Sequence, residues 1–320
     1  MIKKENSKLK VASLFAGIGG ICLGCKQAGM DVIWANEKDS NAAITYKHNH
    51  KETQLIVGDI KKVDVKTMPD FDVLTAGFPC QSFSIAGKQR GFNDSRGNLF
   101  FEIERVIREK MPKVLFLENV ANLVEHDHGR TFLVIYNTLV EYGYFIKYKV
   151  MNAKDYANIP QQRNRIFIVA FLDQRLSDTF EFPNEVELTN NVFDIIDRSE
   201  KHDDCYYYNE SHPKYNQLIK FMQDDMAVYR FTDYGISKQK ENICPTLLAA
   251  MGTMKDRIPI IKDDFGIRKL TPYECLALQG FPKDFQFKGI SMNAAYKQCG
   301  NSVVVPVIRR IAEQIKNVIE

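Results

Sequence analysis

The sequence lacks long apolar runs and a strong charge of one sign, which excludes membrane-spanning and strongly basic classes of protein. No apolar run approaches the roughly 20 residues that a membrane-spanning helix needs, and the first residues contain no signal-type apolar segment. The net charge is +3 in 320 residues. This charge permits a nucleic-acid partner without requiring one. We therefore expect a cytoplasmic globular protein with no membrane partner.

Cysteines are few: seven are scattered along the chain, an odd number without an export signal, which is typical of reduced thiols. A Cys-x-x-Cys pair at residues 22–25 lies inside a helical pattern and has no second pair of ligands. Buried helix positions explain it better than a metal or redox role. Histidine pairs at 48–50 and 126–128 also lack partnering cysteines and are interpreted as solvated loop or helix-end histidines. We expect no metal site.

What is present is an alternation of strand-like and helix-like segments over the first 170 residues. This alternation predicts a Rossmann-like α/β fold with a mostly parallel, doubly wound sheet. The expected strands are short and nearly all apolar, as they are where helices cover both sheet faces. Expected strands are residues 10–15, 31–35, 53–57, 72–76, 114–117, 145–151 and 165–171, and expected helices are 98–109, 130–142 and 303–319.

The composition changes after residue 183, and the next 80 or so residues are polar, rich in tyrosine and poorly periodic. This change predicts a second, smaller and irregular domain. We expect a first domain over residues 1–184, completed by a C-terminal helix at 300–320. The second domain, with its hinge, is expected over residues 185–285.

A glycine-rich turn, Ser13-Leu-Phe-Ala-Gly-Ile-Gly-Gly20, follows the first expected strand and opens a helix. Such a turn lets a ligand approach the backbone in front of a helix N-terminus, although a tight turn without a ligand has the same pattern. Glu37 ends the second strand, where a carboxylate can accept both ribose hydroxyls, and Asp59 ends the third, where it can accept from an adenine amino group. Together these features predict an adenosine-bearing cofactor.

Chemically reactive groups follow the next two strands. Cys80 lies in Gly77-Phe-Pro-Cys-Gln-Ser82, where a thiol would be a strong nucleophile, although a buried structural cysteine is the plainer alternative. Glu118 stands at the tip of the fifth apolar strand, where a carboxyl group suits proton donation. Arg163 and Arg165 alternate at a strand entry; they either reach a base oxygen or a phosphate, or are solvated edge charges.

The order of these motifs resembles that of the DNA (cytosine-5) methyltransferases of bacterial restriction–modification systems. The motifs are Phe-Ala-Gly-Ile-Gly-Gly, the acid Glu37, Gly-Asp-Ile, Pro-Cys-Gln, Glu-Asn-Val, Gln-x-Arg-x-Arg and Gly300-Asn-Ser302. The match covers roughly the first 175 residues and the last 50, whereas residues 185–240 match weakly. The resemblance implies a methyltransferase fold that uses S-adenosyl-L-methionine and releases S-adenosyl-L-homocysteine. It also implies double-stranded DNA as substrate, a monomer on DNA, and pairing with a restriction endonuclease.

The resemblance further implies roles for the reactive residues. Cys80 would attack C6 of a cytosine turned out of the duplex. Glu118 would hold and protonate N3, Arg165 would contact O2, and Arg163 would orient the loop and backbone. The second domain would choose the DNA sequence through contacts with base edges.

The implied binding residues fall into two groups. Cofactor contacts are expected from Phe15, Gly17, Gly19, Gly20, Glu37, Asp59, Ile60, Phe78, Leu99, Asn301 and Ser302. DNA contacts are expected from Gln81, Ser84, Lys88, Arg90, Arg96 and, as a target-strand phosphate contact, Thr246. One departure concerns Lys38, which stands where part of the family has a tryptophan after the ribose-binding acid. Stacking on adenine must there be weakened or replaced.

Other functions fit fewer of these features. A cysteine hydrolase needs a histidine base, and no histidine follows a predicted strand end. Methylation of an adenine amino group would call for an Asx-Pro-Pro-aromatic motif rather than Gly-Phe-Pro-Cys. A transfer-RNA cytosine-5 methyltransferase would show the same catalytic residues. A module that binds DNA or adenosine without turnover is the non-enzymatic alternative.

The nucleophile assignment can be tested by Cys80→Ser. We expect this substitution to abolish methyl transfer, because a hydroxyl group is a far weaker nucleophile than a thiol at neutral pH. The measurement is incorporation of labelled methyl groups into DNA by the purified variant. Turnover near the wild-type rate would show that Cys80 is not the nucleophile.

Overall fold

The chain forms two compact units in the computed structural model, which describes residues 8–78 and 99–320. Both units are assembled from segments that are far apart in the sequence. The first unit consists of Met1–Met151, Asn164–Pro183 and Ile308–Glu320, and the second of Asn152–Arg163 and Asn184–Val307.

These limits differ in part from the expected domain boundaries. The last boundary, expected at residue 300, falls inside the C-terminal helix after Val307. The preceding residues belong to the second unit because Gly300 packs there: a Cβ added to it would lie 2.0 Å from the backbone carbon of Leu248. Residues 152–163, expected in the first domain, also belong to the second unit. Composition did not reveal either assignment, because both depend on close backbone contacts.

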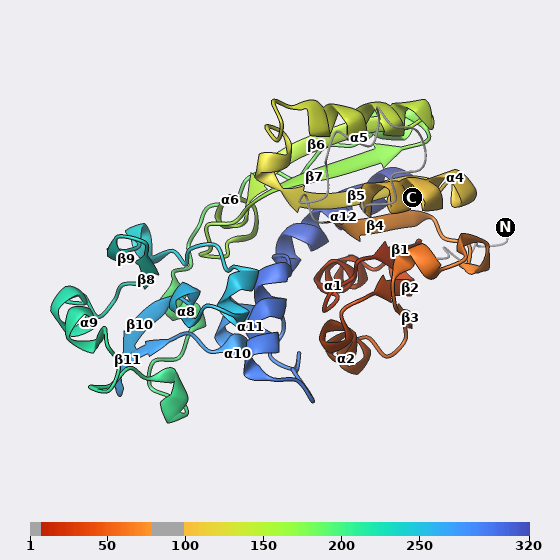
Figure 1. The fold of residues 1–320 in the computed structure, drawn as a ribbon. Coiled ribbons are helices and arrows are strands. Elements are labelled where there is room, and N and C mark those ends of the chain that lie inside the picture. The colour runs from red at the N-terminus through yellow and green to blue at the C-terminus, as the bar shows by residue number, and fades with distance from the viewer. Residues whose placement is uncertain (1–7, 79–98) are drawn as a thin grey trace, which may run out of the picture. The chain divides into compact units, whose positions relative to one another are not determined.

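The first unit is built on a seven-stranded sheet with the order β3-β2-β1-β4-β5-β7-β6 (Figure 1). The pairs β1–β2, β2–β3, β1–β4 and β4–β5 are parallel, whereas β7 runs antiparallel to β5. The predicted α/β class with a mostly parallel sheet is confirmed. The strands are β1 (Lys10–Leu14), β2 (Asp31–Glu37), β3 (Gln54–Val57), β4 (Val73–Gly77), β5 (Val114–Val120), β6 (Phe145–Asn152) and β7 (Asn164–Phe171).

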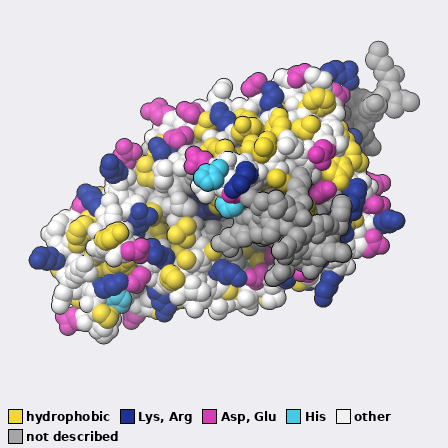
Figure 2. All heavy atoms as spheres, turned by 45° about the horizontal axis from the view of Figure 1, so that its top comes forward, with side chains coloured by type: hydrophobic (Ala, Val, Ile, Leu, Met, Phe, Trp, Pro, Cys, Tyr) yellow, Lys and Arg dark blue, Asp and Glu magenta, His cyan; other side chains and the backbone are white. Residues whose placement is uncertain are grey.

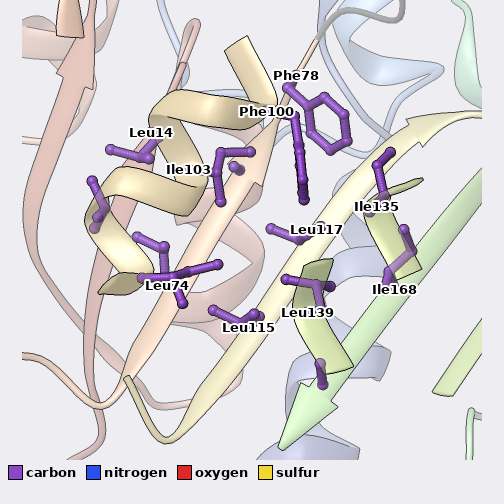
Figure 3. Packing of buried hydrophobic residues seen from close by; sticks show 14 of the residues in the cluster. Leu14, Leu74, Phe78, Phe100, Ile103, Leu115, Leu117, Ile135, Leu139 and Ile168 are labelled. Carbon is purple, nitrogen blue, oxygen red and sulfur yellow. The ribbon is translucent and has the colours of Figure 1, made fainter. Parts of the chain in front are cut away.

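Helices α4 and α5 supply the apolar side chains that cover one face of this sheet (Figure 3). On α4, Phe100, Ile103 and Ile107 are fully buried, and they recur at helical spacing. They pack against alternate strand residues such as Leu74 and Leu117. Each such side chain contributes about 1.5–3 kcal/mol when it leaves water. The described helices of this unit are α1 (Gly20–Gln27), α2 (Ser40–Asn49), α4 (Leu99–Lys110), α5 (Arg130–Glu141), α7 (Gln174–Thr179) and most of α12 (Val305–Ile319).

The opposite face of the sheet is covered as well. Val11, Val73 and Phe116 point away from the α4 side, and at most 1% of each is exposed. Helix α1 packs closely on α12, since a Cβ added to Gly24 would lie 2.6 Å from the Cβ of Ile308. Burial on both faces explains why the strands are apolar along their whole length.

The second unit contains a four-stranded antiparallel sheet with the order β11-β10-β8-β9. The expectation of an irregular domain is therefore wrong in part. Each strand has only four residues, too short for an alternating pattern to stand out, and two-residue turns close both hairpins. The strands are β8 (Tyr229–Thr232), β9 (Gly235–Lys238), β10 (Ile260–Asp263) and β11 (Gly266–Lys269), and the helices are α6 (Ala153–Ala157), α8 (Val192–Ile195), α9 (Tyr215–Phe221), α10 (Pro272–Ala277) and α11 (Met292–Asn301).

A buried charge cluster fastens this small sheet to α10. Arg268, on β11, is completely buried and donates to both carboxylate oxygens of Glu274 at 2.7 and 2.8 Å. It also donates to the buried carboxylate of Asp263. Because an unpaired buried charge is costly, removing either partner of such a pair is strongly destabilising. The cluster therefore fixes the β10–β11 hairpin on the helix.

The described ranges contain no helix that is both long and apolar enough to span a bilayer. On the face drawn in Figure 2, basic and acidic side chains are interspersed among apolar ones. The small positive net charge therefore does not gather into one basic area on the part of that face that the structure describes.

Candidate active site at the carboxyl ends of the strands

The residues singled out from the sequence stand where strands of the first unit end. Phe15 follows β1, Glu37 is the last residue of β2, and Asp59 follows β3. Phe78 follows β4, and Glu118 lies near the end of β5. Because β1 to β5 are parallel, their carboxyl ends meet at one edge of the sheet, which is the edge where open α/β sheets bind ligands.

The glycine-rich loop between β1 and α1 has a left-handed backbone at three positions. The φ angles of Phe15, Gly17 and Gly19 are 53°, 57° and 89°. Positive φ is unusual for phenylalanine and is a form of strain that concentrates at ligand sites. A Cβ added to Gly17 would meet no atom within 4 Å, so the loop is open on that side. Gly20, the last glycine of the motif, is the first residue of α1.

His50 supports the loop from behind. A Cβ added to Gly19 would lie 2.1 Å from its Nε2, which is also 3.2 Å from the carbonyl oxygen of Ile18. Burial lowers the pKa of His50 to about 4, so the ring is neutral at neutral pH and its Nε2–H can donate to that carbonyl. The interpretation of this histidine as solvated is wrong. Its burial could not be predicted from local sequence patterns, because it arises from packing of the end of α2 against the loop.

The carboxylate of Glu37 is already a strong acceptor of backbone hydrogen bonds. Its Oε2 accepts from the N–H of Gly17 at 2.7 Å. Its Oε1 accepts from the N–H groups of Lys38 and Asp39 at 2.8 and 2.6 Å. A carboxylate offers about four acceptor positions, so about one is left. Three backbone hydrogen bonds therefore occupy most of the acceptor capacity of Glu37.

Asp59 caps the short 3₁₀ turn Ile60–Lys62, and its side chain is 25% exposed. The turn is held by Arg105 of α4, which donates to the carbonyl of Ile60 at 2.7 Å and to that of Val63 at 3.0 Å. Ile60 itself is buried. This role of Arg105 could not be predicted from the sequence, because a charged residue on an amphipathic helix ordinarily faces solvent.

Glu118 lies near the carboxyl end of β5 and Arg165 near the amino end of β7, where their side chains meet. Nε of Arg165 lies 2.9 Å from Oε1 of Glu118, and the two side chains are only 15% and 11% exposed. The antiparallel register of the two strands makes this contact possible, since Val120 pairs with Arg165 and Glu118 with Phe167. A Cβ added to Gly77 of β4 would approach Oε2 of Glu118 to 3.3 Å. The carboxylate is therefore enclosed by three neighbouring strands.

Arg163 has a different environment from Arg165 and lies in the second unit. It is 2% exposed, and its guanidinium donates to the carbonyl oxygens of Leu247 at 2.8 Å, Gly300 at 3.0 Å and Ser302. Its side chain thus ties three backbone positions together. Both Nη atoms of Arg163 thus donate to backbone carbonyls, and its implied role in orienting the loop and backbone stays a prediction.

The remaining expected contacts are more dispersed. Phe78 is buried, with its ring centroid 6.0 Å from that of Phe100, and Leu99 is half-buried at the start of α4. In the second unit, Asn301 is exposed at the end of α11, and the hydroxyl of Thr246 donates to the carbonyl of Gln162. Cys80, Gln81, Ser84, Lys88, Arg90 and Arg96 lie outside the described residues.

The side chains present fit an adenosine-bearing methyl donor. An open glycine turn, an aromatic ring and two carboxylates with remaining acceptor positions occupy the ends of three successive strands.

A comparison with protein-family models matches residues 9–317 to the family described as C-5 cytosine-specific DNA methylase. The chain belongs to this family. The match includes residues 185–240, which resemble the family only weakly by motif. The chain is therefore a DNA (cytosine-5) methyltransferase, as the motif order predicted, and it uses a methyl donor and acts on DNA.

Two curated relatives of this methylase align with it over nearly their whole length. The type II methyltransferase M.Bsp6I of Bacillus sp. is 52% identical over 96% of this chain and 98% of its own. The type II methyltransferase M.HhaI of Haemophilus parahaemolyticus is 39% identical over 98% of this chain and 95% of its own.

Solved structures show the same fold at lower identity. The Spodoptera frugiperda DNMT2 mutant superposes with a TM-score of 0.74 at 20% identity, over 98% of this chain and 100% of its own. A putative DNA modification methyltransferase encoded within an E. coli prophage gives a TM-score of 0.68 at 23% identity, over 98% and 99%.

The pair at the ends of β5 and β7 leads to a prediction for Glu118→Gln. We expect methyl transfer to fall by about 10²–10⁴-fold, because an amide cannot deliver a proton as a carboxylic acid does. Affinity for S-adenosyl-L-homocysteine should stay within about twofold, since Glu37 and Asp59 are unchanged. Methyl incorporation and calorimetric binding are the two measurements.

A control for this prediction is Glu313→Gln, which removes a carboxylate that lies 3.5 Å from Arg309 on α12. It should change neither methyl incorporation nor binding. A parallel loss of both activity and binding in Glu118→Gln would mean that Glu118 supports the fold of the site rather than the reaction.

Proposed function

We propose that this methylase transfers a methyl group from S-adenosyl-L-methionine to carbon 5 of a cytosine in double-stranded DNA, with Cys80 as nucleophile. The main support is the Glu118–Arg165 pair, a partly enclosed carboxylate held by a guanidinium at 2.9 Å. The pair lies beside Gly77, the last residue of β4. Cys80 follows Gly77 by three residues in the sequence. A thiol, a proton donor and a fixed cation are the groups that addition to a pyrimidine ring requires.

Phe15, Gly17, Glu37 and Asp59 would hold the adenosine part of the cofactor. Phe78 and Leu99 would extend this site in the first unit, and the cofactor contacts that the resemblance implies for Asn301 and Ser302 stay predictions. When bound, S-adenosyl-L-methionine supplies an electrophilic methyl group. The neutral ring of His50 and the Glu37–Gly17 hydrogen bond of 2.7 Å keep the glycine loop in its left-handed shape for this purpose.

The residues of the chain would act on the cytosine in a balanced sequence. The thiolate of Cys80 forms a bond to C6 while Glu118 gives a proton to N3, so the adduct does not build up negative charge. C5 then carries the electron pair that takes the methyl group. A base, which we take to be water, removes the C5 proton. The C6–S bond breaks to restore the thiolate, and N3 returns its proton to Glu118.

Arg165 would position Glu118 and the base. Its Nε–H is used by Glu118, and its Nη1 donates to the carbonyl of Asn164 at 2.8 Å. We assign the N–H groups of Nη2 to the cytosine O2. A planar guanidinium suits this double task, because its donors lie in a fixed fork.

We further propose that the second unit chooses the DNA sequence and that the enzyme works as a monomer. A flipped base is needed for access to C6, so the substrate cytosine must leave the duplex. Both relatives described above are named type II methyltransferases. These names support a role in protecting host DNA from a partner restriction endonuclease.

Bisulfite sequencing of plasmid DNA tests substrate, position and recognition together. Cells without cytosine methylation would express the chain, and we expect protected cytosines in one short sequence context. Exchange of residues 185–265 with those of a relative should move protection to another context. Unprotected DNA would refute the activity, and an unchanged context would refute the role of the second unit.

A further inference from the structure

Lys38 contacts both acids that are proposed to hold the adenosine group. Its Nζ donates a hydrogen bond to Oδ2 of Asp59 at 2.7 Å. Its backbone N–H donates to Oε1 of Glu37 at 2.8 Å. A single residue therefore connects the acid at the end of β2 with the acid that follows β3.

Asp59 is held from two directions and still has room for another donor. Besides Lys38, its Oδ1 accepts from the backbone N–H of Lys61 at 3.2 Å. The hydrogen bond from the Lys38 ammonium holds the pKa of the Asp59 carboxyl group below its usual value. Of about four acceptor positions on a carboxylate, about two are left. An amino group of a ligand can therefore still bind to Asp59 while Lys38 remains in place.

The backbone beneath this pair is fixed independently of it. The buried side chain of Asn36 donates to the carbonyl oxygens of Ile56 and Gly58, both at 3.0 Å. The N–H of Gly58 in turn donates to the carbonyl of Glu37 at 2.9 Å. These bonds hold the ends of β2 and β3 together. Lys38 is therefore not needed to hold the backbone here, but it can determine the orientation of the Asp59 side chain.

We propose that Lys38 sets the affinity for the adenosine part of the cofactor by holding the Asp59 carboxylate in place as an acceptor. The inference rests on the proposed use of S-adenosyl-L-methionine. Lys38 is a positioning residue in this account and takes no part in methyl transfer. This positioning role also explains how a lysine can stand where part of the family has a tryptophan that stacks on adenine.

This mode of support makes cofactor binding sensitive to salt. The Lys38 side chain is 72% exposed, so its charge is open to screening. The screening length falls from about 10 Å at 0.1 M salt to about 3 Å at 1 M. An exposed ion pair contributes about 0.2–1 kcal/mol, which corresponds to about a 1.4- to fivefold change in affinity.

Calorimetric titration of the full chain with S-adenosyl-L-homocysteine, without DNA, tests the proposal. At about 0.05 M NaCl we expect Lys38→Met to weaken binding about 1.4- to fivefold. At about 0.5 M NaCl the wild-type protein should approach the variant, whose own affinity should change little. Lys38→Gln is a second uncharged variant, and Lys38→Arg should restore binding because it keeps the charge.

A double-mutant cycle separates the pair from a general effect of charge. If Lys38 acts through Asp59, the combination of Lys38→Met with Asp59→Asn should bind no more weakly than Asp59→Asn alone. Additive losses would overturn the assignment, since they would mean that Lys38 acts on the ligand by another route.

The chain offers a closely matched control in Lys113. Its Nζ lies 2.7 Å from Asp72, and the two side chains are 66% and 23% exposed, compared with 72% and 25% for Lys38 and Asp59. This second pair stands just before β4 and β5, at the amino ends of the strands. Lys113→Met should leave binding unchanged at both salt concentrations. An equal loss in Lys113→Met would overturn the proposal.

The outcomes distinguish this inference from the proposed function. If the wild-type protein binds S-adenosyl-L-homocysteine and both Lys38→Met and Lys38→Gln bind it equally well, the role of Lys38 is refuted. The proposed use of the cofactor is not affected by that result. Wild-type protein that binds no S-adenosyl-L-homocysteine would refute the cofactor proposal, and the inference with it.

Discussion

Parallel pairing of β1 to β5 is the constraint on which the site depends. Parallel strands need long crossover connections, so each strand ends at the same edge and a helix or loop begins there. Phe15, Glu37, Asp59, Phe78 and Glu118 therefore come together although more than 100 residues separate the first from the last. The apolar core beneath them keeps the strands in register. The antiparallel β7 then adds Arg165 beside Glu118.

Three acids at this edge are held by different local donors. Glu37 receives three backbone N–H groups and so shapes the glycine loop as well as the ligand site. Glu118 is opposed by a guanidinium and enclosed by neighbouring strands. Asp59 is oriented by a surface lysine. The same chemical group thus serves three purposes, because the local donors differ.

Much of this arrangement could be predicted from the sequence, because it depends on local patterns. Apolar runs marked the strands of the large sheet, and the stripe on residues 98–109 marked α4. The order of motifs predicted the family and the reaction. What could not be predicted depends on contacts between distant segments: the burial of His50, the backbone contacts of Arg163 and the support of Ile60 by Arg105. The small sheet was missed because four-residue strands carry too little periodicity.

The central claim is that a thiol at position 80 adds to the target cytosine beside Glu118. Duplex DNA with 5-fluorocytosine at the target position tests it most directly, since fluorine blocks the loss of a proton from C5. After incubation with S-adenosyl-L-methionine and proteolysis, mass spectrometry should find one methylated fluorocytosine nucleotide bonded to Cys80. Absence of an adduct, or an adduct at another residue, would contradict the account.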